Sequence, residues 1–234
     1  MMKGMKKFTK VTALSLVVFM FVLVLGIQSA DATATLRLSD GTTIIDVADG
    51  SAKDSNPTTG AVTYNDTYGD FSFASVLVST GVTYPLTGTI DYPVVHMDSV
   101  AVTGAGTLDV YFSEIGFGPT GLRPFQSDIG GVAGSSVIGT TYVDGGNALF
   151  GTSTTLTTLG AYGPGSFSGT STDFFNPTDP YSMTTHASIT HTSAGQVTSL
   201  NLQVAVLPEP ISSTLFLVGA GTLGFRRWRK KRAS

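Results

Sequence analysis

The strongest constraint on the fold is a two-residue alternation of apolar and polar side chains that recurs between residues 33 and 208. In the run 107–113, Leu108, Val110 and Phe112 share one face and the residues between them share the other. Successive side chains of a strand point to opposite faces, so this alternation predicts half-buried β-strands. The region also holds 30 threonines, 19 serines and 23 glycines, which favour strands and turns over helices.

The number and length of such runs predict an all-β fold, an antiparallel β-sandwich over residues 33–206. Runs 181–192 and 198–206 alternate clearly, and the glycine-containing stretch 193–196 between them predicts that they form a β-hairpin. Long loops with two short strands, near 154–159 and 166–171, are expected within the glycine-rich stretch 144–180. The other expected strands are 34–38, 42–48, 60–65, 70–78, 94–103 and 136–143.

The first 32 residues resemble a secretory signal peptide. A lysine-rich start precedes the uncharged apolar run 11–27, and Ala30 and Ala32 fit an A-x-A cleavage site. Cleavage after Ala32 is therefore expected, and an uncleaved anchor helix is the alternative, because the apolar run approaches the length that spans a bilayer. In either case the acidic middle of the chain is expected to cross the membrane.

Residues 207–234 combine three features in a fixed order. Pro208-Glu209-Pro210 is followed by the apolar stretch 211–225 and then by a basic cluster that includes Arg226, Arg227, Arg229, Lys230, Lys231 and Arg232. Fifteen apolar residues make a helix of only about 22 Å, against a hydrocarbon core of about 30 Å, so the segment predicts a marginal membrane anchor. The basic cluster is expected to stop transfer and to stay on the cytoplasmic side.

This three-part ending resembles the PEP-CTERM sorting signal of Gram-negative bacteria, a segment also labelled an ice-binding protein C-terminal domain. The resemblance implies a precursor held briefly in the inner membrane and processed by an exosortase-like enzyme that recognises Pro208-Glu209-Pro210. The chain departs from the family in having Ile211-Ser212 where members commonly have Ser-Thr. An ordinary tail anchor is the alternative.

Three stretches of the middle region, residues 36–65, 104–117 and 146–151, are similar to a recurrent group of exported PEP-CTERM proteins. That resemblance implies export and a β-rich fold, and it carries no catalytic residue. The domain organisation expected from all these features is a signal peptide over 1–32, an exported β-sandwich over 33–206 and a sorting signal over 207–234.

Charge and cysteine content exclude several classes of function. Residues 33–208 hold 14 acidic side chains and three basic ones, a net charge of −11, and such a surface repels nucleic acid. The chain has no cysteine, which excludes disulfides, thiolate metal sites and a cysteine nucleophile.

The remaining polar residues give only weak signals for chemistry. His186 and His191 are five residues apart, so one continuous strand places them on opposite faces, and His191 on the apolar face is expected to be structural. No G-x-S-x-G motif occurs, and nothing selects a pair of carboxylates for glycoside hydrolysis. Asp46, Asp49 and Asp54 are close enough in sequence to suggest a weak Ca²⁺ site, but they lack the EF-hand pattern. No catalytic, cofactor-binding or metal-binding residue is predicted.

Carbohydrate binding is the main alternative role for the domain, because tyrosine offers a flat ring with a polar edge. The candidates for exposed rings are Tyr64, Tyr84, Tyr92, Tyr111 and Tyr142. An interrupted threonine row at Thr184, Thr190 and Thr192 gives no basis for ice binding.

Together these features predict an exported, non-enzymatic protein of the cell surface or extracellular matrix, associated with exopolysaccharide or biofilm. Its expected partners are the Sec translocon, signal peptidase, an exosortase-like enzyme, transiently the inner membrane, and exopolysaccharide. Its expected location is first an inner-membrane-anchored precursor and then the cell surface or the medium. A carbohydrate- or Ca²⁺-binding extracellular module is the alternative.

Overall fold

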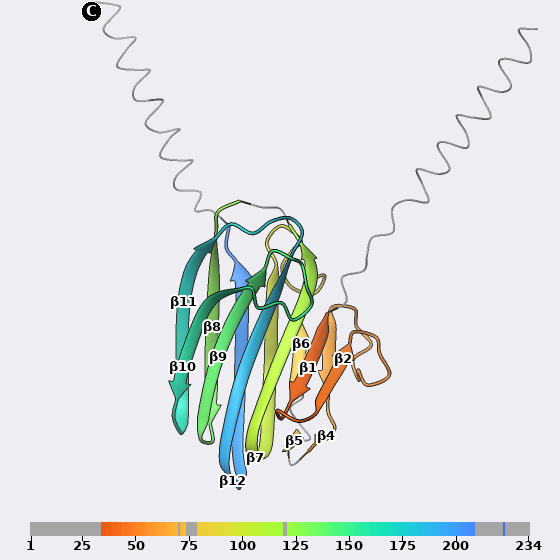
Figure 1. Ribbon diagram of the computed structural model, residues 1–234, viewed down its shortest axis with the longest axis vertical. Coiled ribbons are helices and arrows are strands. Elements are labelled where there is room, and N and C mark those ends of the chain that lie inside the picture. Colours follow the sequence, from red (N-terminus) through yellow and green to blue (C-terminus); the bar gives the residue numbers. More distant parts are fainter. Residues whose placement is uncertain (1–33, 70, 74–78, 119–120, 209–221, 223–234) are drawn as a thin grey trace, which may run out of the picture. The chain divides into compact units, whose positions relative to one another are not determined.

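The computed structural model describes residues 34–69, 71–73, 79–118, 121–208 and Thr222 (Figure 1). The chain divides into two units, residues 1–32 and 33–234, and the described residues all belong to the second. Within them the chain forms twelve strands: β1 (Thr35–Ser39), β2 (Ile44–Ala48), β3 (Ala61–Tyr64), β4 (Thr67–Tyr68), β5 (Phe71–Phe73), β6 (Ser79–Val82), β7 (Val94–Phe117), β8 (Arg123–Ala133), β9 (Ser136–Asp144), β10 (Thr154–Tyr162), β11 (Gly165–Phe175) and β12 (Tyr181–Val206).

Two long strands, β7 and β12, organise the fold. They pair antiparallel over nearly their whole length, and each half of this two-stranded ribbon has its own neighbours. The half made of residues 106–117 and 181–191 pairs with β1 and β9, and these continue to β2 and β10. The other half, residues 94–104 and 196–206, pairs with β5, β6 and β8, and β11 continues from β8. We call these the first sheet and the second sheet.

The ribbon folds over between the two halves, so that the sheets face each other (Figure 1). At the fold the register changes from His191 opposite Gly106 to Gln196 opposite Gly104, which places four residues of β12 against one of β7. The strand on the outside of a bend needs this extra length. Gly106 and Gly195 adopt positive φ values of 103° and 85°, which side chains with a Cβ rarely tolerate.

Side chains from the two sheets meet in one hydrophobic core. Leu108, Val110 and Phe112 from β7 are fully buried, which confirms the alternation predicted for 107–113. The contact between sheets is close: a Cβ at Gly81 of the second sheet would lie 2.2 Å from the ring of Phe112 in the first. The structure is therefore an antiparallel all-β sandwich in the described region, as the sequence predicted.

The hairpin predicted over 181–192 and 198–206 is wrong. Both runs alternate as expected, with buried residues such as Met183 and Leu202, but they belong to one continuous strand and lie in opposite sheets. The stretch 193–196 is the fold of the ribbon between the sheets, where the Gln196 side chain accepts from the amides of Thr192 and Ser193, at 2.7 and 3.2 Å.

The glycine-rich region is more regular than predicted. The short strands expected near 154–159 and 166–171 extend to β10 and β11, of nine and eleven residues. Strand β8 has no counterpart among the strands expected from the sequence. Its alternation is hidden because one of its inward residues is Ser127, which bonds Thr141 of the first sheet at 2.7 Å across the core.

The terminal predictions concern residues that the structure does not describe. Ala30 and Ala32, Glu209, Pro210 and the basic cluster at 226–232 all lie outside the described residues. In the parts of the chain that are described, no helix is long and apolar enough to cross a membrane.

Candidate functional site

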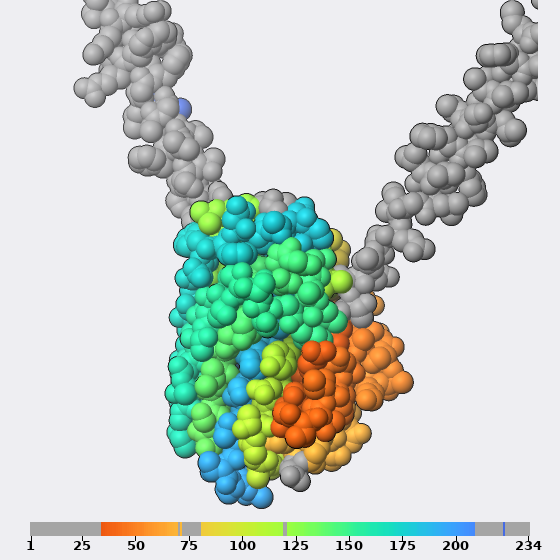
Figure 2. Space-filling model, in the orientation of Figure 1, coloured from red at the N-terminus to blue at the C-terminus, as the bar shows by residue number. Residues whose placement is uncertain are grey.

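The outer face of the first sheet carries charged and aromatic side chains side by side. The register places Tyr111 of β7 between Arg37 of β1 and His186 of β12. Their side chains point away from the core, because the residues that alternate with them, such as Leu38, Val110 and Ala187, are buried. Figure 2 shows this part of the surface, with β1 and β2 in orange, β7 in yellow-green and β12 in blue. We call six residues of this face the outer cluster: Arg37, Asp46, Asp109, Tyr111, Phe150 and His186.

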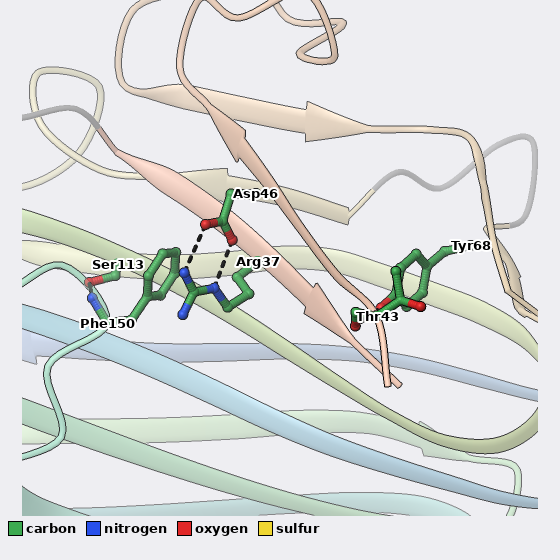
Figure 3. A network of polar contacts seen from close by, with 6 residues as sticks. All are labelled: Arg37, Thr43, Asp46, Tyr68, Ser113 and Phe150. Atoms are coloured by element: carbon green, nitrogen blue, oxygen red, sulfur yellow. Dashed lines mark hydrogen bonds and ion pairs between the residues drawn. The ribbon is translucent and has the colours of Figure 1, made fainter. Parts of the chain in front are cut away.

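Arg37 forms the charged part of the outer cluster. Its guanidinium donates two hydrogen bonds to the carboxylate of Asp46 on β2, at 2.7 and 2.8 Å (Figure 3). This hydrogen-bonded pairing raises the pKa of Arg37, so the guanidinium stays charged. The same group lies 4.0 Å from the centre of the Phe150 ring, a cation–π distance.

Tyr111 and His186 form the aromatic part. Their rings are stacked, with centroids 4.0 Å apart and planes 3° from parallel, and Phe150 approaches Tyr111 edge-on at 6.4 Å. His186 Nε2 lies 2.9 Å from Asp109 Oδ1. Burial alone would raise the pKa of Asp109, but hydrogen bonds from His186 and Ser188 outweigh it and lower that pKa. Asp109 is therefore a carboxylate, and the Nε2–H of His186 donates to it.

Phe150 comes from the segment between β9 and β10, which Asp144 holds in place. The Asp144 carboxylate accepts from the amides of Gly146 and Ala148 and from the Ser153 hydroxyl, at 3.2, 2.9 and 2.5 Å. The bond from Ser153 is the main reason why the pKa of Asp144 is lowered. Asp144 therefore serves to hold the turn that follows β9.

Two further bonds fix this segment on the outer face. The Phe150 amide donates to the buried hydroxyl of Ser113 at 3.0 Å (Figure 3). Asn147 Oδ1 accepts from the Gly116 amide at 2.7 Å. Asn147 and Phe150 both have positive φ, at 55° and 58°, so the surrounding bonds hold a strained backbone. The Phe150 ring is in this way held against Arg37 and Tyr111.

A second group of contacts in Figure 3 is structural. The hydroxyl of Tyr68 donates to the carbonyl of Thr43 and accepts from the amide of Asp40 at 3.1 Å. Asp40 Oδ1 in turn accepts from the amides of Thr42 and Thr43, at 2.8 and 2.7 Å. These bonds close the β1–β2 hairpin at Asp40-Gly41.

The histidines fall where their spacing predicted. His186 faces outward and His191 is buried, on the opposite face of β12. His191 Nδ1 lies 3.0 Å from the Gly104 carbonyl and Nε2 lies 2.7 Å from the Thr198 hydroxyl, so both ring nitrogens have a partner. His191 is therefore the structural histidine that the sequence analysis expected. Burial lowers the pKa of His96 on the second sheet.

The three carboxylates considered for Ca²⁺ are not brought together. Asp46 is paired with Arg37, Asp49 accepts from the Gly60 amide at 2.7 Å, and Asp54 accepts from the amides of Asn56 and Thr63, at 2.9 and 2.8 Å. No group of three or more metal-ligating side chains occurs within the described ranges. Asp49 and Asp54 instead satisfy backbone amides of the turn between β2 and β3.

The candidate tyrosines do not form one platform. Tyr84 and Tyr92 are exposed, as considered, but Tyr64 is buried and its hydroxyl donates to the Thr67 carbonyl at 2.9 Å. Tyr111 and Tyr142 are half-buried on the outer face of the first sheet. The threonine row is also interrupted, because Thr184 is fully buried and hydrogen-bonds Ser113 at 2.9 Å.

A carboxyl group with a raised pKa lies inside the sandwich. Glu114 of β7 is 2% exposed and points into the core, where it accepts a hydrogen bond from Thr83. Burial raises the pKa of Glu114 to about 7. A raised pKa is typical of a general acid, but this side chain is buried in the core and lies on neither outer face.

The comparisons with known proteins do not assign a family. No family model and no curated protein matches the sequence. Among solved structures, the K1 adhesin domain of Lys-gingipain from Porphyromonas gingivalis W83 is 14% identical with a TM-score of 0.33, over 68% of this chain and 97% of that domain. Tailspike protein 4 of bacteriophage CBA120 is 12% identical with a TM-score of 0.33; the alignment covers 76% of this chain but only about a fifth (20%) of the tailspike chain.

Proposed function

We propose that the chain is an exported, non-enzymatic β-sandwich protein of the cell surface or extracellular matrix, sorted by an exosortase-like enzyme through residues 207–234. One observation carries the proposal. Among the described residues, the last backbone bond along the chain is donated by the Leu207 amide to the Pro124 carbonyl at 2.9 Å, and the next residue, Pro208, is exposed. The Pro208-Glu209-Pro210 motif therefore begins two residues after the end of β12.

This boundary suits processing in the membrane. All strands of the described region lie between Thr35 and Val206, so removal of residues 1–32 or of residues after Pro210 takes no strand from either sheet. The two prolines of the motif disfavour helix and leave extended backbone for recognition. Signal peptidase and the Sec translocon would act on the amino-terminal segment, and an exosortase-like enzyme on the carboxyl-terminal one.

The non-enzymatic part of the proposal rests on how the carboxylates are used. On the outer face of the first sheet, Asp46 is paired with Arg37 and Asp109 with His186. Glu114 is enclosed between the sheets. Each of these three carboxyl groups thus has a structural partner, and the arrangement supports a binding or scaffolding role.

The test is fractionation of cells of an exosortase-carrying Gram-negative host that express the full chain. A triple variant, Pro208→Ala, Glu209→Ala and Pro210→Ala, should accumulate as precursor in the inner membrane, because helix can then continue through the motif. A variant with residues 226, 227, 229, 230, 231 and 232 neutralised should differ, because it loses the stop-transfer signal and passes through the membrane. Normal processing of the triple variant would refute exosortase sorting.

A second role, saccharide binding, is favoured by the outer cluster. Phe150 and Tyr111 supply ring surface beside the charged side chains of Arg37 and Asp109. Aromatic rings can pack against the C–H faces of a sugar, and charged side chains can hydrogen-bond its hydroxyls. We expect exopolysaccharide in an affinity gel to retard the full chain. Phe150→Ala should lower the retardation at least fivefold, while Phe174→Ala, which removes an exposed ring outside the outer cluster, should leave it unchanged. Equal retardation of both variants would refute this site.

A further inference from the structure

The chain leaves the sandwich between two loops at one end of β12. The Val206 amide donates to the Pro93 carbonyl at 3.0 Å, and the Leu207 amide donates to the Pro124 carbonyl at 2.9 Å. Pro93 precedes β7 and Pro124 lies at the start of β8. The departure point is thus fixed against two parts of the sandwich rather than left on a free tail.

Large apolar side chains surround this departure point. Ile90 is 48% exposed, Tyr92 38%, Leu122 65% and Phe174 62%. We call these four residues the exit patch. Exposed apolar side chains that gather in one place, unlike single ones, typically mark an interaction surface.

Contacts among the loops place the four residues of the exit patch on segments that meet at one end of the sandwich. Phe174 lies opposite Pro124 in the β8–β11 ladder, and Leu122 is two residues before Pro124. Arg123 donates to the Asp91 carbonyl at 2.8 Å and lies 4.9 Å from the centre of the Tyr92 ring, which joins the start of β8 to the loop before β7. The Gly118 amide donates to the Ile90 carbonyl at 3.3 Å. In Figure 1 the start of β8 and the ends of β11 and β12 accordingly lie at the same end of the sandwich.

The apolar segment after β12 indicates what lies next to this end of the sandwich in the anchored precursor. The apolar segment 211–225 begins four residues after Leu207, a distance of at most about 14 Å in extended chain. The polar layer on each side of a bilayer is roughly 5–8 Å thick. In a chain anchored through 211–225, the connecting residues are therefore only slightly longer than this layer is thick, and the sandwich must lie close to it. Pro208 and Pro210 restrict the backbone further.

We propose that the exit patch, Ile90, Tyr92, Leu122 and Phe174, lies in the headgroup layer of the membrane while the precursor is anchored. This inference rests on the proposed anchoring through residues 211–225. Tyrosine and aliphatic side chains are the residue types that favour this layer. The docked domain would present Pro208-Glu209-Pro210 at the membrane surface, where a membrane enzyme can reach the motif.

The charges near the exit patch favour neutral lipid. Asp91 and Asp173 lie beside it, while the guanidinium of Arg123 is already engaged by the Asp91 carbonyl and the Tyr92 ring. Among the residues that the structure describes, this end of the sandwich therefore presents no free basic cluster of the kind that binds anionic headgroups. We expect the contact to form on phosphatidylcholine and to need no anionic lipid.

The absence of cysteine makes a site-specific test possible. Leu122→Cys, Phe174→Cys and Val197→Cys variants of residues 33–234, the precursor that remains after the expected signal cleavage, would each carry one fluorophore, so that only residues 211–225 can anchor the chain. Val197 is the matched control: it is 50% exposed and lies nine residues along β12 from Val206, about 30 Å at the rise of a strand. The labelled chains are reconstituted into phosphatidylcholine vesicles that contain a headgroup nitroxide lipid, and flotation with the vesicles reports anchoring.

The labels at 122 and 174 should be quenched by the nitroxide lipid at least twofold more than the label at 197, and they should be less accessible to iodide. Equal quenching at all three sites in chains that float would overturn the exit patch proposal and leave the anchoring intact. Protection of 122 and 174 from both quenchers would mean that another part of the chain covers the patch, and would also overturn it. Chains that fail to float would overturn the anchoring and, with it, the membrane contact.

Discussion

Tyr111 and His186 stack face to face across β7 and β12, with ring centroids 4.0 Å apart. Their positions are directly opposite in the ladder, so the pairing of the two longest strands is what creates the stack. Asp109, two residues before Tyr111 on the same strand, holds the imidazole by a 2.9 Å contact. The centre of the outer cluster is therefore built on strands, and only Phe150 is brought to it by a loop.

This stack should appear as a coupling energy in stability measurements. Tyr111→Ala and His186→Ala should each destabilise the fold, and in the double variant the losses should fall short of additivity by about 0.5–1.5 kcal/mol, the usual value of an aromatic pair. Chemical denaturation of the four proteins measures this term. The pair Thr107→Ala and Thr190→Ala gives a comparison, because these hydroxyls share a 3.2 Å hydrogen bond on the same face and measure the coupling of a cross-strand pair without rings. Additive losses at 111 and 186 would show that the rings do not interact.

Asp144 should control the segment that carries Phe150. Asp144→Ala removes the acceptor of the Ala148 amide and the Ser153 hydroxyl, at a cost of about 1–2 kcal/mol. The released segment should become a chymotrypsin site, because Leu149 is already 41% exposed and Phe150 follows it. Limited proteolysis with mass detection checks this, with Asp173→Ala as a control outside the segment. Resistance of Asp144→Ala equal to that of the parent would contradict the role given to this carboxylate.

Glu114 should make the stability of the sandwich fall as pH rises. Its pKa is raised by burial from 4.5 to about 7, so between these values the folded chain binds a proton that the unfolded chain has lost. The resulting loss of unfolding free energy should be complete at about pH 8. It should amount to about 3 kcal/mol, since one pKa unit corresponds to about 1.4 kcal/mol.

Denaturation of the parent and of Glu114→Gln across pH 4.5–8 isolates this contribution. The amide keeps the shape of the side chain and an acceptor for Thr83, but it does not titrate. The variant should lose less stability than the parent on going from pH 5 to pH 8. Parallel profiles for the two proteins would mean that Glu114 does not titrate between the sheets as described.

The close approach of the two sheets gives a steric prediction. A Cβ at Gly81 would meet the Phe112 ring at 2.2 Å, so Gly81→Ala should destabilise the fold by about 1–3 kcal/mol through overpacking. In a domain of this size that corresponds to a melting temperature lower by roughly 3–10 °C. Gly163→Ala is the matched control, because a Cβ there has no atom within 4 Å. Calorimetry that shows equal melting temperatures for the two variants would contradict the packing of Gly81 on Phe112.

The sequence predicted the strands whose buried and exposed residues alternate without interruption. The two-residue alternation correctly predicted the buried residues of β7 and β12. These are Leu108, Val110 and Phe112 in β7 and Leu200, Leu202 and Val204 in β12. The alternation did not predict β8, because Ser127 and Thr141 form a polar contact inside the core and so break the apolar pattern. A hydrogen-bonded pair across two sheets leaves no signal in either strand alone.

The hairpin error has a different cause. A glycine-containing stretch between two alternating runs is compatible with a hairpin and with a strand that changes sheets, and only the partner strand decides between them. Here Gly104 and Gly106 of β7, far away in the sequence, bend at the same point as residues 192–195. Phe150 was missed from the site for a related reason: its place against Arg37 depends on bonds from Asp144 and Ser113 that no local pattern shows.

The most direct test of the central claim is the intact mass of the protein recovered from an exosortase-carrying Gram-negative host. Export and sorting predict a mature chain that begins at Thr33 and lacks residues 226–232, with the sandwich from Thr35 to Val206 complete. A mass that retains residues 11–27 would contradict export through a cleaved signal peptide. A mass that retains residues 226–232 throughout the life of the protein would contradict sorting and identify the chain as a simple tail-anchored envelope protein.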